Sequence, residues 1–393
     1  MSILTDAAEI AFPRYPGSEG DRRATEIVRR KMLDAGLEVE VEEFSYDIRP
    51  AFRAIRLVLL ASAALVLAAT ALVSSLPLAA LSLLAAGALS GGLLLVWAPG
   101  AERLYSRAGP TKTANVTGYR RVARPHLSLI LLAHHDSKSQ NLTFPVRMGL
   151  TLLSLLGGAG FAGLLVAAAV KGRPVEPEWI SIVAGVATAA ALGGLSVLRS
   201  GNGSPGGVDN AGSVGIVLEL ARTLPGTTGE GVELIFLATG AEEDHMIGAM
   251  RWLAAHRERF RGRPLYALNF DGAGAPGKVV LIERYGFGTP FSRELSEVAR
   301  AAASRLGIGV RGIVMLPAMG IDAIPFAHRG VPCLTLSSGS LDRATISVHS
   351  VNDVADHLDE PTLERVARLG REVVAELERR YAAGLSPPPA SGT

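Results

Sequence analysis

Three long stretches of this 393-residue chain carry no charged side chain, and they constrain its fold more than any other feature. They are Leu57–Ala101, Met148–Val170 and Trp179–Leu198, with 45, 23 and 20 residues. The other 305 residues hold all 76 charged side chains, about a quarter, which is the ordinary fraction for a globular domain. The sequence therefore predicts a globular domain interrupted by apolar insertions, and it excludes a disordered chain and a fibrous protein.

The apolar insertions are long enough to cross a membrane. Because about 20 apolar residues span the hydrocarbon core, 57–101 accommodates two spans with a break at Ser74–Pro77. Segment 148–198 holds two more, joined by a short polar loop. We therefore predict four transmembrane helices as two hairpins, 57–101 and 148–198, and a lipid bilayer as a partner. The alternative, buried core helices of a soluble protein, is disfavoured by the near-bilayer length of the uncharged stretches.

The charges that flank the spans predict their orientation. Nine lysines and arginines lie within fifteen residues of the spans on the domain side, against Lys171 and Arg173 on the far side. This bias places the domain in the cytoplasm, so we expect a multi-pass cell-membrane protein with a cytoplasmic domain. The segment Met1–Phe12 contains two acidic residues and no apolar run, so it does not resemble a signal peptide.

Net charge and cysteine content exclude several further classes. The formal net charge is +2 and no basic block is present, so we expect no nucleic-acid partner. The single cysteine, Cys333, excludes an internal disulfide framework and a cysteine-only metal site. Glycine-rich runs such as Gly157–Gly160 would pack spans within one chain or between copies, which leaves a homo-oligomer open.

The remaining segments, 1–56, 102–147 and 199–385, are expected to form one domain together, with 386–393 as a loose tail. Strands and helices alternate along them, which predicts an α/β fold: a mixed, largely parallel sheet with helices on both faces. The expected strands are Leu37–Tyr46, Ala114–Tyr119, Leu127–Ala133, Val232–Ala238, Leu265–Phe270, Val279–Glu283, Gly309–Val314 and Cys333–Ser337. The expected helices are Glu19–Ala35 and those near 213–223, 245–260, 290–306 and 361–382.

Acidic and imidazole side chains recur just after the expected strands. In α/β sheets the binding crevice lies at the carboxyl ends of the strands, so these side chains are expected to meet there. Histidines and carboxylates together suit zinc, with cobalt or manganese as alternatives. The motifs are, in chain order, His134-His135-Asp136, Gly206-Gly207-Val208-Asp209-Asn210, Glu242-Glu243, Asp271 and His349.

Taken singly, each motif has a structural explanation. A lone histidine is more often structural than a ligand, paired acids favour a helix start, and Asp-Asn or Asp-Gly favours a turn. The remaining histidines lack a partner motif and are expected to be structural: His245, His256, His328 and His357. The joint pattern of the five motifs is what points to a metal site.

The ordered motifs resemble the co-catalytic zinc exopeptidases of metallopeptidase family 28. That family includes aminopeptidases, glutamate carboxypeptidase II, the transferrin-receptor ectodomain and, more distantly, glutaminyl cyclases. The resemblance covers the globular residues and none of the apolar stretches. It rests on His134-x-Asp136, Gly207–Asn210, Glu242-Glu243, Asn269-Phe270-Asp271 and His349–Asp353, with further likeness at Pro16–Arg23, Asp322–Phe326 and Gly330–Pro332.

The resemblance implies two zinc ions and assigns a ligand role to each of five residues. Asp209 would bridge the two ions. His134 and Asp271 would hold one ion, and Glu243 and His349 would hold the other.

The resemblance also implies the two residues that we expect to be catalytic. Glu242 would be the general base, and Asp136 would accept a hydrogen bond from the second ring nitrogen of His134 and fix its tautomer. The family further implies a cis peptide between Asp209 and Asn210. Spacing alone does not decide between His134 and His135 as the ligand, and Tyr285 is a candidate oxyanion donor only because it follows a strand.

The span count supports the ligand scheme. His134 and Asp209 lie on either side of the second hairpin, so they can meet only if an even number of spans separates them. Two spans satisfy this condition. At ~3.3–3.6 Å per extended residue, Asp209 lies within ~40 Å of the end of the last span.

We therefore expect a membrane-embedded di-zinc aminopeptidase that removes N-terminal residues from peptide substrates. Carboxypeptidase, dipeptidase and glutaminyl-cyclase activities at the same site remain alternatives, as does a non-catalytic membrane scaffold. No ligand position is lost, which disfavours the scaffold, because buried paired acids are costly to keep without a function. The uncharged spans disfavour a transporter, since ion pathways place charges inside the membrane.

Overall fold

The computed structural model describes residues 2–90, 107–316, 319–340 and 342–382, and the chain divides into two compact units. One unit contains residues 1–45, 109–139 and 201–393, and we call it the sheet unit. The other contains residues 46–108 and 140–200, and we call it the helical unit. The end of the first expected hairpin, 91–101, and the expected tail, 386–393, lie outside the described residues.

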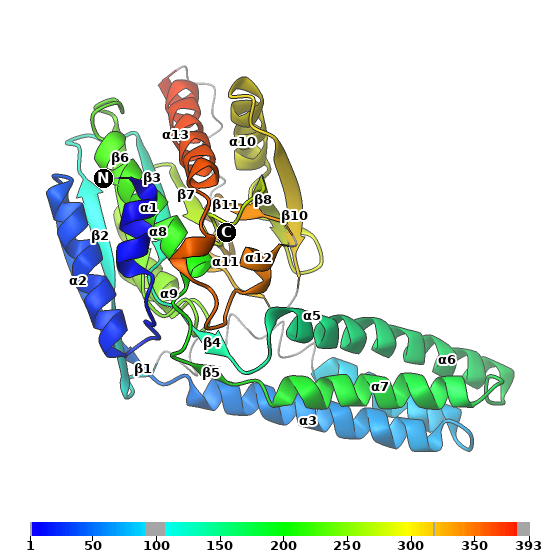
Figure 1. The fold of residues 1–393 in the computed structure, drawn as a ribbon. Coiled ribbons are helices and arrows are strands. Elements are labelled where there is room, and N and C mark those ends of the chain that lie inside the picture. Colours follow the sequence, from blue (N-terminus) through cyan, green and yellow to red (C-terminus); the bar gives the residue numbers. More distant parts are fainter. Residues whose placement is uncertain (1, 91–106, 317–318, 341, 383–393) are drawn as a thin grey trace. The chain divides into compact units, whose positions relative to one another are not determined.

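A nine-stranded sheet forms the centre of the sheet unit, with the order β1-β2-β6-β3-β7-β11-β8-β10 and β9 paired to β8 (Figure 1). The pairs β6–β3, β3–β7, β7–β11 and β8–β10 are parallel, whereas β2–β6, β11–β8 and β8–β9 are antiparallel. The expected mixed, largely parallel sheet is therefore confirmed. The strands are β1 (Glu38–Tyr46), β2 (Thr111–Arg120), β3 (Leu127–His134), β6 (Val232–Thr239), β7 (Leu265–Phe270), β8 (Lys278–Tyr285), β9 (Thr289–Pro290), β10 (Val310–Met315) and β11 (Cys333–Gly339).

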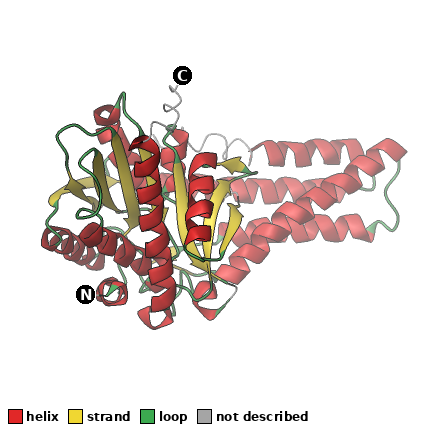
Figure 2. Ribbon diagram, turned by 90° about the horizontal axis from the view of Figure 1, so that it is seen from above, coloured by secondary structure: helices red, strands yellow, loops and turns green. Residues whose placement is uncertain are grey.

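Helices cover both faces of this sheet (Figure 2), which explains why its central strands are continuous apolar runs. Every residue of β3 and β6 is buried. Successive residues of β3 point to opposite faces, so Leu131 joins one core cluster and Leu132 the other. The helices are α1 (Ile3–Ile10), α2 (Glu19–Asp34), α8 (Gly212–Thr223), α9 (Ile247–His256), α10 (Arg293–Arg305), α11 (Ala323–His328), α12 (Arg343–Ile346) and α13 (Glu360–Ala382).

Two local features differ from the sequence-based expectations. The helix α1 was not expected, although Ser2 caps it by accepting a hydrogen bond from the Thr5 amide. The helix expected from residue 245 begins only at Ile247. Backbone φ is positive at Ala241, His245 and Met246, so this stretch is a turn and not a first helical turn. That turn carries Glu242 and Glu243.

Three helices of the helical unit are long and apolar enough to cross a membrane: Arg49–Leu72, Phe144–Lys171 and Trp179–Ser196. The fourth expected span is described only as the helix Pro77–Ser90, which is too short by itself. Two helices therefore separate His134 from Asp209, as the ligand scheme requires. The first of the three long helices is α3 (Arg49–Leu72) and the third is α7 (Trp179–Ser196). The second consists of α5 (Phe144–Leu152), the π-helical turn Leu153–Gly157 and α6 (Gly158–Lys171). The short strands β4 (Ser139–Gln140) and β5 (Ser200–Gly201) pair with each other.

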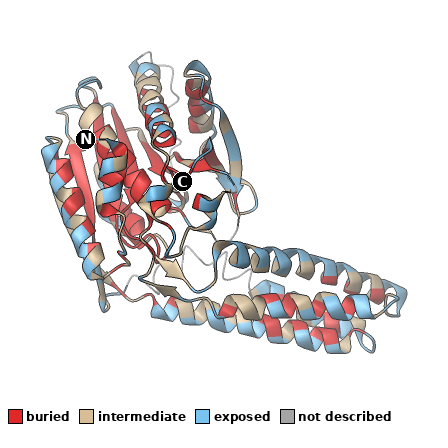
Figure 3. Cartoon of the chain, viewed as in Figure 1, coloured by how far each residue is buried: buried red, intermediate tan, exposed pale blue. Residues whose placement is uncertain are grey.

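The helices of this unit approach one another through small residues, and exposed positions are interspersed with buried ones along them (Figure 3). A Cβ added at Gly185 of α7 would lie 2.0 Å from the Thr70 hydroxyl of α3, so only glycine permits this approach. The side chains of Leu67, Leu156 and Val183 are 49%, 70% and 56% exposed on the helix surfaces.

Candidate metal centre

The predicted site residues gather at the carboxyl ends of the parallel strands. His134 ends β3, and its parallel partner in β6 is Thr239, just ahead of the turn that carries Glu242 and Glu243. Asp271 follows β7, where its amide donates to the carbonyl of Leu336 in β11. Parallel pairing brings these strand ends to one edge of the sheet, as the sequence predicts.

His134, Asp209 and Asp271 form the first group of potential metal ligands, with one donor atom of each lying within 4.8 Å of the others. Nε2 of His134 is 3.1 Å from Oδ1 of Asp209 and 4.0 Å from Oδ1 of Asp271. This Nε2 atom is buried and has no hydrogen-bond partner among the described residues. A buried ring nitrogen that faces two carboxylates in this way fits a metal ligand.

Asp209, Glu243 and His349 form the second group under the same distance limit. Nε2 of His349 lies 3.0 Å from Oδ2 of Asp209 and 3.3 Å from Oε2 of Glu243. The two carboxylate oxygens of Asp209 therefore face different histidines, one in each group. The peptide between Asp209 and Asn210 is cis, as the resemblance implies.

The spacing of these donor atoms fits zinc. With Zn–N and Zn–O distances of about 2.0–2.1 Å, neighbouring ligand atoms of a tetrahedral site are roughly 3.3 Å apart. The contacts of Asp209 with His134 and His349 and the contact of His349 with Glu243 are 3.0–3.3 Å. The donor set is imidazole and carboxylate, which zinc accepts and which cobalt and manganese also accept.

Asp136 organises the turn that carries the paired glutamates. Its Oδ1 accepts a hydrogen bond from the Glu242 amide at 3.2 Å, and its Oδ2 accepts from the Glu243 amide at 3.0 Å. Nδ1 of His134 lies 3.2 Å from the main-chain oxygen of Asp136 and 3.6 Å from its Oδ1. The hydrogen-bond contact of this ring nitrogen is thus with the main-chain oxygen of Asp136, whereas the Asp136 carboxylate holds the two amides of the acidic turn.

Glu242 borders the first group without belonging to it. Its Oε2 lies 3.8 Å from Nε2 of His134. Burial, followed by the neighbouring acids Glu243 and Asp271, raises the pKa of Glu242 well above its usual value, although His134 opposes this. This carboxyl therefore holds a proton more readily than an exposed glutamate does.

His135 points away from the two groups. Its Nε2 lies 3.3 Å from Oδ1 of Asp21 and 3.2 Å from the hydroxyl of Thr25, both on α2. The structure therefore distinguishes the two adjacent histidines, which the sequence spacing could not. Only His134 faces Asp209.

Electrostatics differ between the two groups. Burial raises the pKa of Asp271 to about 8. Burial also opposes ionisation of Glu243, but the ammonium of Lys138 and the imidazole of His349 lower its pKa to about 2. Lys138 is the larger of these two influences on Glu243: its Nζ lies 2.7 Å from Oε2 of Glu243, and its amide donates to Oε1 at 2.9 Å.

Some residues around the groups were not singled out from the sequence, and one candidate is misplaced. Lys138 and Arg14 carry no sequence signal beyond their closeness to Asp136 and to the Pro16-Gly17 turn. Tyr285 is wrong as an oxyanion donor. Because β8 runs antiparallel to β11, and Val279 pairs with Ser338 at the site edge, Tyr285 lies about 20 Å away along the strand.

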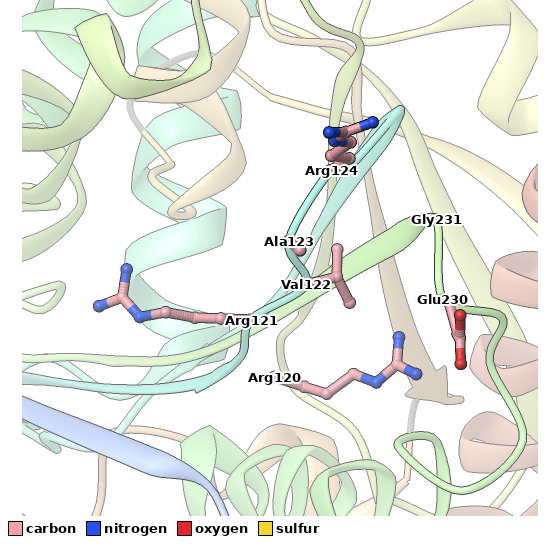
Figure 4. A pocket seen from close by; sticks show the side chains of 7 residues that line it. All are labelled: Arg120, Arg121, Val122, Ala123, Arg124, Glu230 and Gly231. Carbon is pink, nitrogen blue, oxygen red and sulfur yellow. The ribbon is translucent and has the colours of Figure 1, made fainter.

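A hollow of about 550 Å³ lies at the opposite ends of β3 and β6 (Figure 4). The arginines around it have other partners or point outward: Arg120 donates to the carbonyls of Thr228, Gly229 and Val232, and Arg121 pairs with Glu38 and Glu40. This hollow is separate from the candidate metal centre, because it borders the starts of the parallel strands.

Comparison with known proteins finds a family match for part of the chain. The model named Peptidase family M28 matches residues 184–374, a range that contains Asp209, Glu243, Asp271 and His349 but not His134. No curated protein matches the chain.

Three solved structures share the fold at 12–15% identity, a level that shows the fold alone. An aminopeptidase from Aneurinibacillus sp. strain AM-1 has 15% identity and a TM-score of 0.56, over 95% of this chain and 92% of that chain. The zinc aminopeptidase BSAP from Bacillus subtilis has 13% identity and a TM-score of 0.55, over 95% and 93%. A glutaminyl cyclase from Fimbriiglobus ruber has 12% identity and a TM-score of 0.54, over 95% and 94%. Residues 184–374 are therefore similar to peptidase family M28, which supports a metallopeptidase, and the chain shares the fold of the aminopeptidases compared above.

Proposed function

We propose that the chain is a membrane-embedded di-zinc aminopeptidase. The observation that carries the proposal is the Asp209 carboxylate, whose two oxygens lie 3.1 and 3.0 Å from histidines of two different ligand groups. In the proposed scheme His134 and Asp271 would hold one ion and Glu243 and His349 would hold the other. Asp209, which belongs to both groups, would be shared between the two ions.

When bound, two zinc ions would supply a water of lowered pKa and would polarise the scissile carbonyl. Glu242 takes a proton from the attacking water and returns it to the leaving amine, for which its raised pKa is suited. Asp136 keeps Glu242 in place through its main-chain amide. A free substrate amine pairs with an acidic group of this cluster, which restricts cleavage to chain ends.

Completeness of both ligand groups favours hydrolysis over the other activities. A glutaminyl-cyclase-type site works with one metal, whereas here the second group, Asp209, Glu243 and His349, is assembled within 4.8 Å. A non-catalytic scaffold has no use for five converging ligands. A carboxypeptidase would require recognition of a substrate carboxylate, and Lys138, the cation beside the second group, is already engaged by Glu243.

The test is hydrolysis by the zinc-loaded full chain in detergent. Matched peptides would carry a free or acetylated N-terminus and a free or amidated C-terminus, with an N-terminal glutamine peptide included. We expect cleavage only of peptides with a free N-terminus, at either C-terminus, and loss of about 100- to 10,000-fold in Glu242→Gln with metal content retained. Cleavage that needs a free C-terminus, or formation of pyroglutamate, would overturn the proposal.

The proposed topology has the sheet unit in the cytoplasm and the loop 172–178 outside. The chain has one cysteine, Cys333, which is buried, so single introduced cysteines can be labelled cleanly. Arg173→Cys should react with a membrane-impermeant maleimide in intact cells, whereas Arg284→Cys should react only after permeabilisation. Both positions are exposed in the structure. The reverse pattern would contradict the orientation.

A further inference from the structure

Arg14 is a fully buried arginine whose guanidinium is surrounded by main-chain carbonyl oxygens. Nε donates to the carbonyl of His135 at 2.5 Å, and Nη2 donates to that of Gly206 at 2.9 Å. Nη1 donates to the carbonyls of Phe12, at 3.1 Å, and Pro205. One cation thus connects the segment that carries His134 with the turn that leads to Asp209.

Asp353 is fully buried as well, and it accepts hydrogen bonds from main-chain amides of the same turn. Its Oδ1 accepts from the amide of Val208 at 2.7 Å, and its Oδ2 accepts from the amide of Asp209 at 3.2 Å. Its main-chain oxygen accepts from the amide of Gly207 at 2.8 Å. The turn 205–209 is therefore held by a cation at its first carbonyls and by an anion at its last amides.

Glycine makes this arrangement sterically feasible. Gly206 has a φ of +60°, and a Cβ there would lie 2.5 Å from the Asp209 carbonyl oxygen and 3.0 Å from Nη1 of Arg14. A Cβ at Gly207 would lie 2.5 Å from the carbonyl oxygen of Val354. Because Gly206 and Gly207 have no side chain, Arg14 and the chain next to Asp353 can come close to the backbone of this turn.

Arg14 and Asp353 also balance buried charge around the turn. The acidic groups that act electrostatically on Arg14 include Asp136, Asp353 and Asp209. Asp136 holds the amides of Glu242 and Glu243, just as Asp353 holds those of Val208 and Asp209. The Arg14 guanidinium is a buried positive charge that both of these carboxylates act on. Buried carboxylates require a positive charge nearby.

We propose that Arg14 and Asp353 are positioning residues that fix the Asp209 carboxylate between the two metal-ligand groups. Neither residue belongs to either group of potential ligands. They act through the turn that carries Asp209, and Arg14 acts also through the carbonyl next to His134. This inference rests on the proposed di-metal function, and it adds two residues on which metal binding depends.

The experiment measures cobalt(II) binding to the full chain in detergent, by metal stoichiometry, dissociation constants and the d–d absorption band. The variants are Arg14→Lys, Arg14→Met and Asp353→Asn. We expect a loss of about 10- to 100-fold in affinity and an altered band, because partners of ligand-bearing groups orient the ligands. Arg14→Lys should fail to restore binding, since an ammonium keeps the charge but not the planar set of donors.

The matched control is Lys31→Met, which removes another buried cation of the same unit. Lys31, on α2, is 6% exposed. Its Nζ lies 2.8 Å from the carboxylate of Asp6 and 2.6 Å from that of Glu9, both on α1. It should lower the melting temperature of the metal-free protein while leaving cobalt affinity and the absorption band unchanged. If Arg14→Met does not fold, Arg14→Lys and Asp353→Asn decide the question.

The outcomes separate the two claims. Wild-type protein that fails to bind two cobalt ions overturns the proposed function and this inference together. Wild-type binding of two ions, with the Arg14 and Asp353 variants within twofold in affinity and with an unchanged band, overturns this inference alone.

Discussion

Lys138 holds both carboxylate oxygens of Glu243, through its amide at 2.9 Å and its ammonium at 2.7 Å. This contact fixes the orientation of Glu243, and it offsets the effect of burial on that carboxyl. Together with His349, Lys138 lowers the pKa of Glu243 to about 2, whereas burial raises the pKa of Asp271 to about 8 against the opposing effect of His134. The two ligand groups thus differ in the protons that a metal ion must displace.

Lys138→Met should weaken metal binding at acidic pH more than at neutral pH. Without the ammonium, burial raises the pKa of Glu243, so a proton competes with the metal as pH falls. Zinc affinity measured against a chromophoric chelator from pH 5 to pH 8 tests this expectation. Lys112→Met, at an exposed position in β2, is the control and should follow the wild type. A parallel loss at all pH values would instead indicate a purely steric role for Lys138.

Metal binding should release protons, and affinity should rise with pH. Burial raises the pKa of Asp271 to about 8, and the surrounding carboxylates outweigh burial to raise the pKa of both His134 and His349. These groups hold protons in the metal-free protein below their raised pKa values, so affinity should fall about tenfold per pH unit for each proton displaced. Titration calorimetry in two buffers of different ionisation enthalpy counts these protons. Equal heats in both buffers would contradict the expectation.

The two adjacent histidines should have separable roles. His134→Ala should reduce bound metal from two ions per chain to one, because it removes a ligand of the first group. His135→Ala should keep both ions but lower the free energy of unfolding by about 1–3 kcal/mol, since Asp21 loses a buried partner. Metal analysis and denaturant unfolding of both variants make the comparison. Metal loss in His135→Ala with retention in His134→Ala would reverse the assignment.

Alanine at Gly185 should lower the stability of the helical unit, whereas alanine at Gly193 should not. Gly185→Ala drives a methyl group into the Thr70 hydroxyl and Phe161, whereas nothing lies within 4 Å of a Cβ at Gly193 of the same helix. Overpacking of this kind costs about 1–3 kcal/mol, so Gly185→Ala should unfold more readily in detergent and Gly193→Ala should not. Equal stability of the two variants would show that α3 and α7 do not pack through Gly185.

The sequence by itself determined the sheet and the long apolar helices, and it predicted which residues gather at one edge of the sheet. Continuous apolar runs such as Leu127–Ala133 predict buried parallel strands, because side chains on both faces of such strands are covered. His134, Asp209, Glu243, Asp271 and His349 stand at strand ends or at the start of a helix, so a common sheet edge was expected. The uncharged lengths of the insertions likewise predict spans, since only hydrocarbon thickness sets that requirement.

Only the tertiary structure decided which side chains face each other. His134 and His135 are equivalent by spacing, and they differ because one ring turns toward Asp209 and the other toward α2. Tyr285 was misplaced because strand direction is not written in a strand's own residues, and β8 runs antiparallel to β11. Arg14, Lys138 and Asp353 act through contacts more than 100 residues away in the chain. Such contacts depend on how the sheet brings its strand ends together, which local sequence patterns do not contain.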